Sequence, residues 1–401
     1  MVEHSGFSQE RLARIPRFLA RQVEAGELPG ALTLIWRRGR IAHRSTVGAI
    51  DLARGTSMRE DAIFRLYSMT KPVTAVALLM LLEEGRIALD DPVARFIPGF
   101  AGLKLADGRE AGGAMTVLDL LRHTAGFTYG FHNRTPIDAL YRAQKIAEMD
   151  TEGGLAAMIA ALEKLPLEYV PGTQWIYSVA TDVAGWLVQL VSGQGFADFV
   201  RAHILMPLKM ADTDFLVPDG RRERFAACYI RREGRLDLFD DSHKSPFFAP
   251  PKLESGGGGL AGTAYDYLRF CRMLLNRGEL DGVRLLSPKT VALMTANHLP
   301  GGADIAGLSP ASDLFNESGY RGIGFGLGVS VMLDPAQAGI PGTAGEFAWG
   351  GMASTAFFVD PREDMAVIFM TQVITDTARR VRLRRDLRTL IYGAMTESYA
   401  A

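Results

Sequence analysis

The sequence contains few cysteines and no excess of charge of either sign. Cys228 and Cys271 are its only thiols. Two cysteines are too few for a disulfide framework and match no zinc-ligand spacing, so we expect both to be buried free thiols. The 44 lysine and arginine residues nearly balance the 45 aspartate and glutamate residues, for a formal net charge of −1. This balance provides no basic surface for nucleic acid or for an anionic membrane, and we expect neither partner.

Long apolar runs and metal-ligand patterns are missing as well. No apolar run approaches the roughly 20 residues that a membrane-spanning helix requires, and the first ten residues lack the basic and apolar regions of a signal peptide. We therefore expect a cytoplasmic protein. No group of histidine, aspartate and glutamate residues has the spacing of metal ligands, so the sequence predicts neither a metal nor another cofactor.

The chain is nevertheless long and apolar enough for a large core. It has 401 residues, of which 48% are hydrophobic and 22% charged, which corresponds to two domains or to one domain with a large insertion. Periodicity predicts a helix over residues 8–25 and strands over 31–36 and 41–47 near the N-terminus. Toward the C-terminus it predicts strand segments over 326–333, 346–349, 355–359 and 365–371, followed by a helix over 377–395.

The middle of the chain has mostly helical patterns. We therefore predict an α+β fold, an α/β sandwich in which an antiparallel sheet from both termini is flanked by the terminal helices, with a mostly helical lobe beside it. The α/β domain would comprise residues 1–67 and 255–401 and the helical domain residues 68–254, with the active site at their junction. Apart from the helix within residues 64–85 and the two terminal helices, the predicted helices are 116–123, 136–148, 153–165, 180–192, 196–206, 264–276 and 287–296.

The most apolar predicted helix, within residues 64–85, opens on a Ser-x-x-Lys pair. Residues 73–82 are apolar except for Thr74, which predicts a helix buried on all sides. Ser68 and Lys71 are three residues apart and therefore lie on one helical face, where the amine can reach the hydroxyl. Ser68 would lie at the helix N-terminus, where free N–H groups and the helix dipole favour developing negative charge.

This pair has the chemistry of an activated nucleophile. A serine hydroxyl is a weak nucleophile at neutral pH and requires a neighbouring base. Lysine can be that base only when its pKa is lowered, and an apolar site lowers it by penalising the charged form. Alternatively, Ser68 is only a helix N-cap and Lys71 has no role beside it, because a Ser-x-x-Lys spacing is common by chance. Against this alternative, the spacing occurs nowhere else in this chain.

Further motifs follow this pair in order along the chain. They are 120–126 (Leu-Leu-Arg-His-Thr-Ala-Gly), 171–182 (Pro-Gly-Thr-Gln-Trp-Ile-Tyr-Ser-Val-Ala-Thr-Asp), 255–260 (Ser-Gly-Gly-Gly-Gly-Leu) and 349–351 (Trp-Gly-Gly). Together with Ser68-Met-Thr-Lys71, this series resembles the class C branch of the serine β-lactamase-like superfamily, which includes penicillin-binding proteins, and more narrowly the family VIII carboxylesterases. The resemblance extends over nearly the whole chain.

The resemblance implies a base and an oxyanion hole. Tyr177 matches the catalytic tyrosine, whose phenol relays a proton between Lys71 and the Ser68 oxygen, and a cationic lysine nearby would lower the phenol pKa. Without the other motifs, a core position beside Trp175 would explain this tyrosine better. By family position, the backbone N–H groups of Ser68 and Met352 form the oxyanion hole.

Two departures from the β-lactamase pattern point to a neutral substrate. Val179 stands where β-lactamases have the asparagine that contacts the β-lactam acylamide. Trp349-Gly350-Gly351 stands in place of Lys-Thr-Gly, so an indole replaces the cation that helps to bind the substrate carboxylate. The glycines let the strand backbone approach the substrate closely, although an ordinary bulge would also account for them. The resemblance thus implies an ester with a short acyl chain, hydrolysed through an acyl-enzyme on Ser68.

Aromatic residues near these motifs indicate an apolar pocket, although aromatic residues near a cleft are often simply core. The Gly- and Pro-rich segment 299–320 is a candidate rim that limits entry. The expected pocket residues are Phe127, Tyr129, Val179, Trp349, Gly350 and Gly351, with Phe131, Trp175 and Tyr320 as further aromatic neighbours.

Several alternatives stay open at this point. A Ser-His-Asp hydrolase is disfavoured, because the chain has no Gly-x-Ser-x-Gly elbow and His123 is better explained as ordering its loop. A β-lactamase or D,D-peptidase would share the fold and the nucleophile, and a transesterase would pass the acyl group to an alcohol. A non-catalytic binding protein is disfavoured by the presence of Ser68, Lys71 and Tyr177. The expected partner is a small-molecule ester, and the sequence predicts no oligomeric state.

Overall fold

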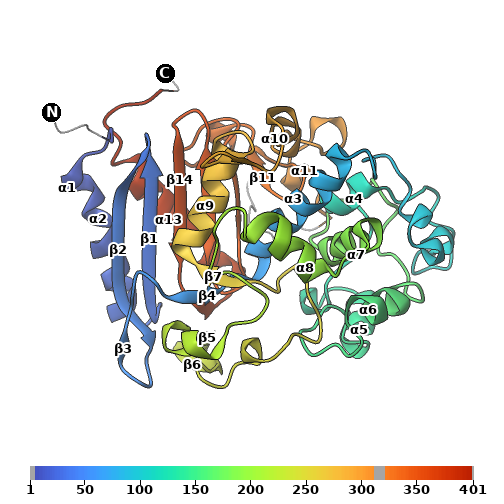
Figure 1. The fold of residues 1–401 in the computed structure, drawn as a ribbon, viewed down its shortest axis with the longest axis horizontal. Coiled ribbons are helices and arrows are strands. Elements are labelled where there is room, and N and C mark those ends of the chain that lie inside the picture. Colours follow the sequence, from blue (N-terminus) through green and yellow to red (C-terminus); the bar gives the residue numbers. More distant parts are fainter. Residues whose placement is uncertain (1–4, 311–320, 400–401) are drawn as a thin grey trace.

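The sheet at the centre of the fold is built from both ends of the chain. The computed structural model describes residues 5–310 and 321–399. Eight strands pair antiparallel in the order β10-β11-β12-β13-β14-β1-β2-β3, so N-terminal strands, blue in Figure 1, lie beside red C-terminal ones. The strands are β1 (Gly30–Arg37), β2 (Arg40–Asp51), β3 (Thr56–Ser57), β10 (Ile323–Phe325), β11 (Ser330–Met332), β12 (Phe347–Gly350), β13 (Ala356–Asp360) and β14 (Met365–Met370).

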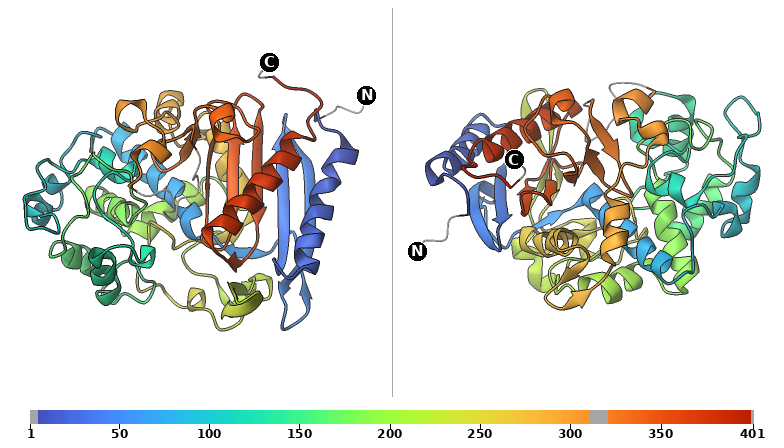
Figure 2. Two further views of the ribbon diagram at one scale, coloured as in Figure 1. Left: turned by 180° about the vertical axis from the view of Figure 1, so that it is seen from behind. Right: turned by 90° about the horizontal axis from the view of Figure 1, so that it is seen from above.

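Both faces of this sheet are covered, and the alternation of side chains along β1 shows how. Leu32 and Leu34 belong to the larger hydrophobic core, whereas Ala31 and Ile35 belong to a second core on the opposite face. The second core lies beneath the terminal helices, which Figure 2 shows crossing that face of the sheet: α1 (Gln9–Leu12), α2 (Arg14–Glu24) and α13 (Thr377–Tyr392).

The larger core contains the apolar helix that follows Ser68. This helix is α3 (Thr70–Glu83), and eleven of its fourteen residues are buried, as its composition predicts. It packs against α7 (Ala180–Ser192), while α9 (Ala264–Leu275) packs against β14. A Cβ on Gly328, whose φ is +82°, would lie 2.7 Å from the Ala75 Cβ. The β10–β11 hairpin can therefore approach α3 this closely only because residue 328 is glycine.

Most of the remaining helices lie to one side of the sheet, at the right in Figure 1. The helix predicted over 136–148 already ends at Ala143, because Lys145 and Ala147 adopt positive φ. The predicted α+β fold with an antiparallel sheet and a helical lobe is confirmed. The remaining helices are α4 (Val117–Leu121), α5 (Pro136–Ala143), α6 (Gly154–Leu162), α8 (Phe196–Val200), α10 (Pro288–Met294), α11 (Ile305–Leu308) and, near the sheet, α12 (Pro335–Ala338).

One expectation about strands is wrong, and one hairpin is not predicted. Segment 326–333 is not one strand, because residues 326–329 form the turn between β10 and β11. No strand is predicted within 228–240, yet the structure has a hairpin there, whose turn residues Glu233 and Gly234 both adopt the positive φ of a tight hairpin. The small sheets contain β5 (Cys228–Arg232), β6 (Arg235–Asp240) and β15 (Val373–Ile374), then β4 (Ile63–Arg65) with β7 (Ala261–Thr263), and β8 (Glu279–Leu280) with β9 (Val283–Arg284).

The two cysteines are both buried and free, as predicted. Over residues 5–310 and 321–399, no helix combines the length and apolar character needed to cross a membrane. Within the same ranges, no three His, Cys, Asp or Glu side chains are grouped so that they could hold a metal ion.

Candidate active site

Ser68 lies at a turn between a strand and a helix. β4 ends at Arg65, and Tyr67 then adopts a φ of +45°, which is uncommon for a bulky residue and typical of strained functional turns. Ser68 belongs to the short 3-10 turn Tyr67–Met69 that leads directly into α3, and it is 8% exposed. The N–H groups at such a helix start have no intrahelical acceptor, so they are available to a negative charge.

Lys71 lies one turn further on, with an acceptor for each of its three protons. Its Nζ is 3.3 Å from Ser68 Oγ, 3.0 Å from the Tyr129 hydroxyl and 2.8 Å from the Gly257 carbonyl oxygen. Burial lowers the pKa of Lys71 to about 7, and the Asp182 carboxylate acts in the opposite direction. An amine with this pKa is partly neutral at neutral pH, so it can accept a proton from the serine hydroxyl.

Tyr177 contacts the same serine oxygen. Its hydroxyl donates a short hydrogen bond to Ser68 Oγ, and Lys71 Nζ lies 4.5 Å from the centre of its ring. Its backbone carbonyl accepts a hydrogen bond from His132 Nε2 at 2.6 Å. Burial raises the pKa of the Tyr177 phenol and outweighs its hydrogen bonds with Ser68 and Trp349. The expectation of a lowered phenol pKa is therefore wrong: the pKa is raised, which favours the protonated form that donates to Ser68 Oγ.

A second tyrosine and a buried carboxylate complete the surroundings of Lys71. Asp182, in the first turn of α7, accepts hydrogen bonds from Ser255 Oγ at 2.5 Å and from the Gly257 N–H at 3.0 Å. A Cβ on Gly257 would lie 2.5 Å from Asp182 Oδ2 and 2.8 Å from the Tyr129 hydroxyl. The tight backbone approach expected of the glycine run is thus present, because only glycine fits between these two side chains.

Sequence reasoning missed the role of this network. It placed Tyr129 only in the pocket and assigned nothing to Asp182, which is fully buried. Burial raises the pKa of Asp182, while the Lys71 cation and the bonds from Ser255 and Gly257 lower it. The available signal was the position of Asp182 in the same motif as Tyr177, at the start of the next helix.

The end of β12 approaches the turn that carries Ser68. A Cβ on Gly351 would collide with the Leu66 carbonyl oxygen and with the Thr355 hydroxyl, so glycine is required for this approach. The Ser354 N–H donates to the Gly351 oxygen at 3.0 Å and closes a tight turn around Met352. No acceptor for the Met352 N–H is found among the described residues. This N–H can therefore serve a ligand beside the Ser68 turn.

Aromatic rings surround the reactive groups. The Trp349 ring lies 5.5 Å from the Tyr177 ring and 5.2 Å from the Phe325 ring, measured between centroids. Tyr129 stacks on Phe131 at 4.6 Å with an interplanar angle of 19°. Phe131 is 45% exposed, so this stack leads from the buried lysine to the surface.

Other residues expected in the pocket lie in the core. Phe127 packs edge-on against Phe100 at 5.6 Å, and Val179 is fully buried at the start of α7. Their contact with a substrate stays a prediction. Tyr320, with the end of the proposed rim 299–320, lies outside the described residues.

His123 has the loop-ordering contacts expected of it. Its carbonyl oxygen accepts from the Ile176 N–H at 2.9 Å, and its Nδ1 lies 3.4 Å from Ser178 Oγ. Burial lowers the pKa of His123 well below the ordinary value, so the ring is neutral. These contacts join the loop after α4 to the segment that carries Tyr177.

Comparisons with known proteins identify the family of this chain. The family model described as Beta-lactamase matches residues 15–390. Protein Rv1367c of Mycobacterium tuberculosis is 35% identical over 364 residues, 88% of each chain. Esterase EstB of Burkholderia gladioli is 33% identical over 378 residues, 90% of each chain. The solved structure of EstCE1, a hydrolase with promiscuous acyltransferase activity, matches with a TM-score of 0.81 and 26% identity over 96% of this chain and 99% of its own.

The fold and these relatives therefore define a carboxylic ester hydrolase with the β-lactamase/transpeptidase-like fold, as the sequence predicts. The chain belongs to the β-lactamase family. The resemblance to the serine β-lactamase-like superfamily, on its family VIII carboxylesterase branch, is confirmed.

Proposed function

We propose that this protein is a serine esterase that hydrolyses short-chain carboxylic esters through an acyl-enzyme on Ser68. The observation that carries the proposal is the position of Ser68 Oγ, 3.3 Å from the Lys71 amine and hydrogen-bonded by the Tyr177 hydroxyl. The pKa of Lys71, lowered by burial to about 7, supports its role as the base. The name of the related Burkholderia gladioli protein, an esterase, supports the substrate class.

In the acylation step, Ser68 Oγ attacks the ester carbonyl carbon and its proton passes to the neutral Lys71 amine. The negative charge that develops on the carbonyl oxygen is stabilised by the N–H groups of Ser68 and Met352, and losing one such donor typically costs about 100-fold or more in turnover. When the bond to the alcohol breaks, the alcohol oxygen takes the proton from Lys71 through the Tyr177 hydroxyl.

In the deacylation step, water attacks the acyl carbon and gives a proton to the same Lys71–Tyr177 pair. The bond between the acyl carbon and Ser68 Oγ then breaks, Ser68 regains its proton and the carboxylic acid leaves. Tyr129 and Asp182 hold the amine in place, since the first accepts a bond from Lys71 and the second fixes Gly257, whose carbonyl oxygen accepts another.

The reactive groups come from both predicted domains. Lys71 belongs to the proposed helical domain, residues 68–254, whereas Gly257, whose carbonyl oxygen lies 2.8 Å from Lys71 Nζ, belongs to the proposed α/β domain, residues 1–67 and 255–401. Their meeting supports the proposed division, with the substrate bound at the junction.

A neutral ester fits the site better than an anionic β-lactam. Trp349 supplies a ring 5.5 Å from Tyr177 where β-lactamases have a cation for the substrate carboxylate. Val179 offers no side-chain amide for an acylamide. Acyl transfer to an alcohol is the second candidate function, supported by the promiscuous acyltransferase activity named for EstCE1.

Hydrolysis of p-nitrophenyl acetate, butyrate and octanoate tests the proposal. We expect the wild type to prefer the two short esters, Ser68→Ala to be inactive, and the exposed control Ser57→Ala to match the wild type. Activity that survives Ser68→Ala would overturn the assignment of the nucleophile. Faster turnover of nitrocefin than of the butyrate ester would favour a β-lactamase, and a new ester formed with added alcohol would favour a transesterase.

A further inference from the structure

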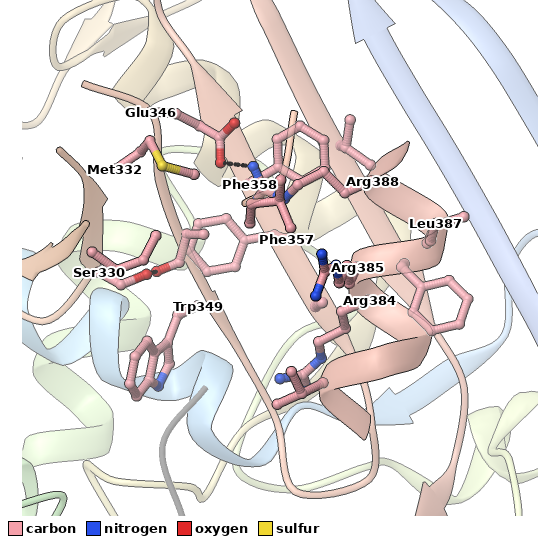
Figure 3. A pocket seen from close by; sticks show the side chains of 17 residues that line it. Ser330, Met332, Glu346, Trp349, Phe357, Phe358, Arg384, Arg385, Leu387 and Arg388 are labelled. Carbon is pink, nitrogen blue, oxygen red and sulfur yellow. Dashed lines mark hydrogen bonds and ion pairs between the residues drawn. The ribbon is translucent and has the colours of Figure 1, made fainter. Parts of the chain in front are cut away.

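Arg384, in the C-terminal helix α13, contacts the turn that follows β12 and contains Met352. Arg384 projects from α13 into the space between this helix and the sheet (Figure 3). That space is a cavity of about 90 Å³, also lined by Trp349, Ala356 and Phe357. Burial lowers the pKa of Arg384 to about 9, so the guanidinium stays cationic at neutral pH.

The Arg384 guanidinium donates to two backbone carbonyl groups of the turn. Its Nη2 lies 3.0 Å from the Gly351 oxygen and also donates a short hydrogen bond to the Thr355 oxygen. The Gly351 oxygen accepts a second bond from the Ser354 N–H. The carbonyl of Gly351 is therefore held by a charged donor and a backbone donor together.

The Gly351 carbonyl and the Met352 N–H are the two ends of one peptide group. A trans peptide is planar, and its C=O and N–H point in opposite directions. Fixing the carbonyl on Arg384 therefore fixes the direction of the Met352 N–H on the opposite side. A cationic donor on a carbonyl also polarises the amide, which strengthens its N–H as a hydrogen-bond donor.

The two glycines of Trp-Gly-Gly permit contacts on different sides of this strand end. A Cβ on Gly350 would lie 2.5 Å from Arg384 Cζ, so glycine makes room for the guanidinium. A Cβ on Gly351 would instead collide with the Leu66 carbonyl oxygen, just before Ser68. Gly350 therefore leaves room for the Arg384 side chain, and Gly351 leaves room for the turn that carries the proposed nucleophile Ser68.

We propose that Arg384 is a positioning residue for the oxyanion hole: it orients and polarises the Gly351–Met352 peptide so that the Met352 N–H is ready for the developing charge. This inference rests on the proposed function, because it requires that N–H as an oxyanion donor. The competing explanation is that Arg384 only fastens α13 to the sheet. Arg385, whose guanidinium donates to the Gly339 oxygen at 2.9 Å, provides a matched control on the same helix.

The sequence offers a direct spectroscopic probe, because residues 351 and 352 are the only Gly-Met pair in the chain. Protein labelled with ¹³C at glycine carbonyls and ¹⁵N at methionines therefore gives one correlated NMR signal, from this peptide. In Arg384→Met we expect the carbonyl signal to move upfield and the Met352 N–H signal to shift, because the carbonyl loses a charged donor. In Arg385→Met we expect both signals to stay in place.

Turnover of p-nitrophenyl butyrate provides the functional readout. We expect Arg384→Met to lower kcat about tenfold, less than the roughly 100-fold cost of removing an oxyanion donor. We expect KM to change less than about twofold, because the oxyanion forms only in the transition state. Arg384→Lys should recover part of kcat, since it returns a cationic donor. Arg385→Met should keep the wild-type kcat.

Wild-type kcat in Arg384→Met, or an equal loss of kcat in Arg385→Met, would overturn the inference, as would an unmoved peptide signal. If Arg384→Met does not fold, Arg384→Lys decides: a shifted signal with a reduced kcat supports the inference, and wild-type values contradict it. Failure of the proposed function is distinguishable, because the wild type itself would then show no esterase activity that depends on Ser68.

Discussion

The two halves of the proposed site are built in different ways. On one side, Ser68, Lys71 and Tyr177 would act through atoms of their own side chains, since the Lys71 amine and the Tyr177 hydroxyl each lie within hydrogen-bond distance of Ser68 Oγ. On the other side, Met352 contributes only a backbone N–H, whose direction depends on a carbonyl held by Arg384. Side-chain chemistry leaves a pattern of residue types in the sequence, whereas backbone chemistry depends on glycines and on contacts from distant segments.

The side-chain half should give the largest loss. Lys71→Met keeps an apolar stem but removes the proposed base, and we expect kcat/KM for p-nitrophenyl butyrate to fall about 10³-fold, within the range of general acid–base catalysis. The exposed Lys289→Met is the matched control and should behave like the wild type. A loss smaller than about tenfold would contradict the assignment of Lys71 as the base.

The two tyrosines around Lys71 should differ in their effects. Tyr177→Phe removes a hydroxyl that contacts Ser68 Oγ, and we expect kcat/KM to fall about 100-fold. Tyr129→Phe removes a hydroxyl that contacts Lys71 instead, and we expect about a tenfold loss. Both are measured on the same ester after circular dichroism has confirmed folding. Equal losses would mean that direct contact with the serine oxygen is not what distinguishes Tyr177.

The backbone half can be tested by adding one methyl group at a time. In Gly351→Ala the new Cβ meets the Leu66 backbone, which displaces the Met352 N–H, and we expect kcat to fall about 100-fold. In Gly350→Ala the new Cβ meets the Arg384 side chain, which can move aside, and we expect a loss of about tenfold. Measuring kcat and the thermal unfolding temperature of both variants tests this order of losses. A larger loss of kcat in Gly350→Ala than in Gly351→Ala would contradict the account.

The smallest change in rate, but a defined change in pH dependence, is expected for Asp182→Asn. The Asp182 carboxylate raises the pKa of Lys71 by favouring its cation, against the larger effect of burial. The proposed base acts as a neutral amine, so kcat/KM rises with pH through the pKa of Lys71. Removing the carboxylate charge lowers that pKa and should move the acid limb of the profile to lower pH.

The pH–rate profile of Asp182→Asn is compared with that of the exposed control Asp198→Asn, which should match the wild type. Asparagine keeps an oxygen that can accept from Ser255 and Gly257, so the change tests charge rather than packing. An unmoved acid limb, or one moved to higher pH, would show that Asp182 does not set the proton affinity of Lys71.

Elements that depend on local pattern could be predicted from the sequence. The helix over 180–192 is confirmed to the residue, because its periodic run stops at Gly193, which adopts the left-handed conformation of a helix end. Ser68 and Lys71 could be paired for a similar reason, since three-residue spacing at the start of an apolar helix fixes their geometry.

Elements that depend on distant partners could not be predicted. The hairpin over 228–240 pairs with β15 near the other end of the chain, and a Glu-Gly turn is a weak hairpin signal. The sequence does not indicate that Asp182 is fully buried, because carboxylates are seldom fully buried and no residue near it in the sequence is an obvious charged partner. Arg384 is one of several arginines in α13, and its contacts with the Gly351 and Thr355 carbonyl groups, which the sequence does not indicate, distinguish it.

Trapping the acyl-enzyme tests the proposed nucleophile most directly. Protein mixed with p-nitrophenyl acetate and quenched in acid during the first turnovers should carry one acetyl group, which peptide mass spectrometry should place on Ser68. Ser68→Ala treated in the same way should carry none. An acetyl group on a different residue, or hydrolysis without any acetyl group on Ser68, would contradict the serine mechanism.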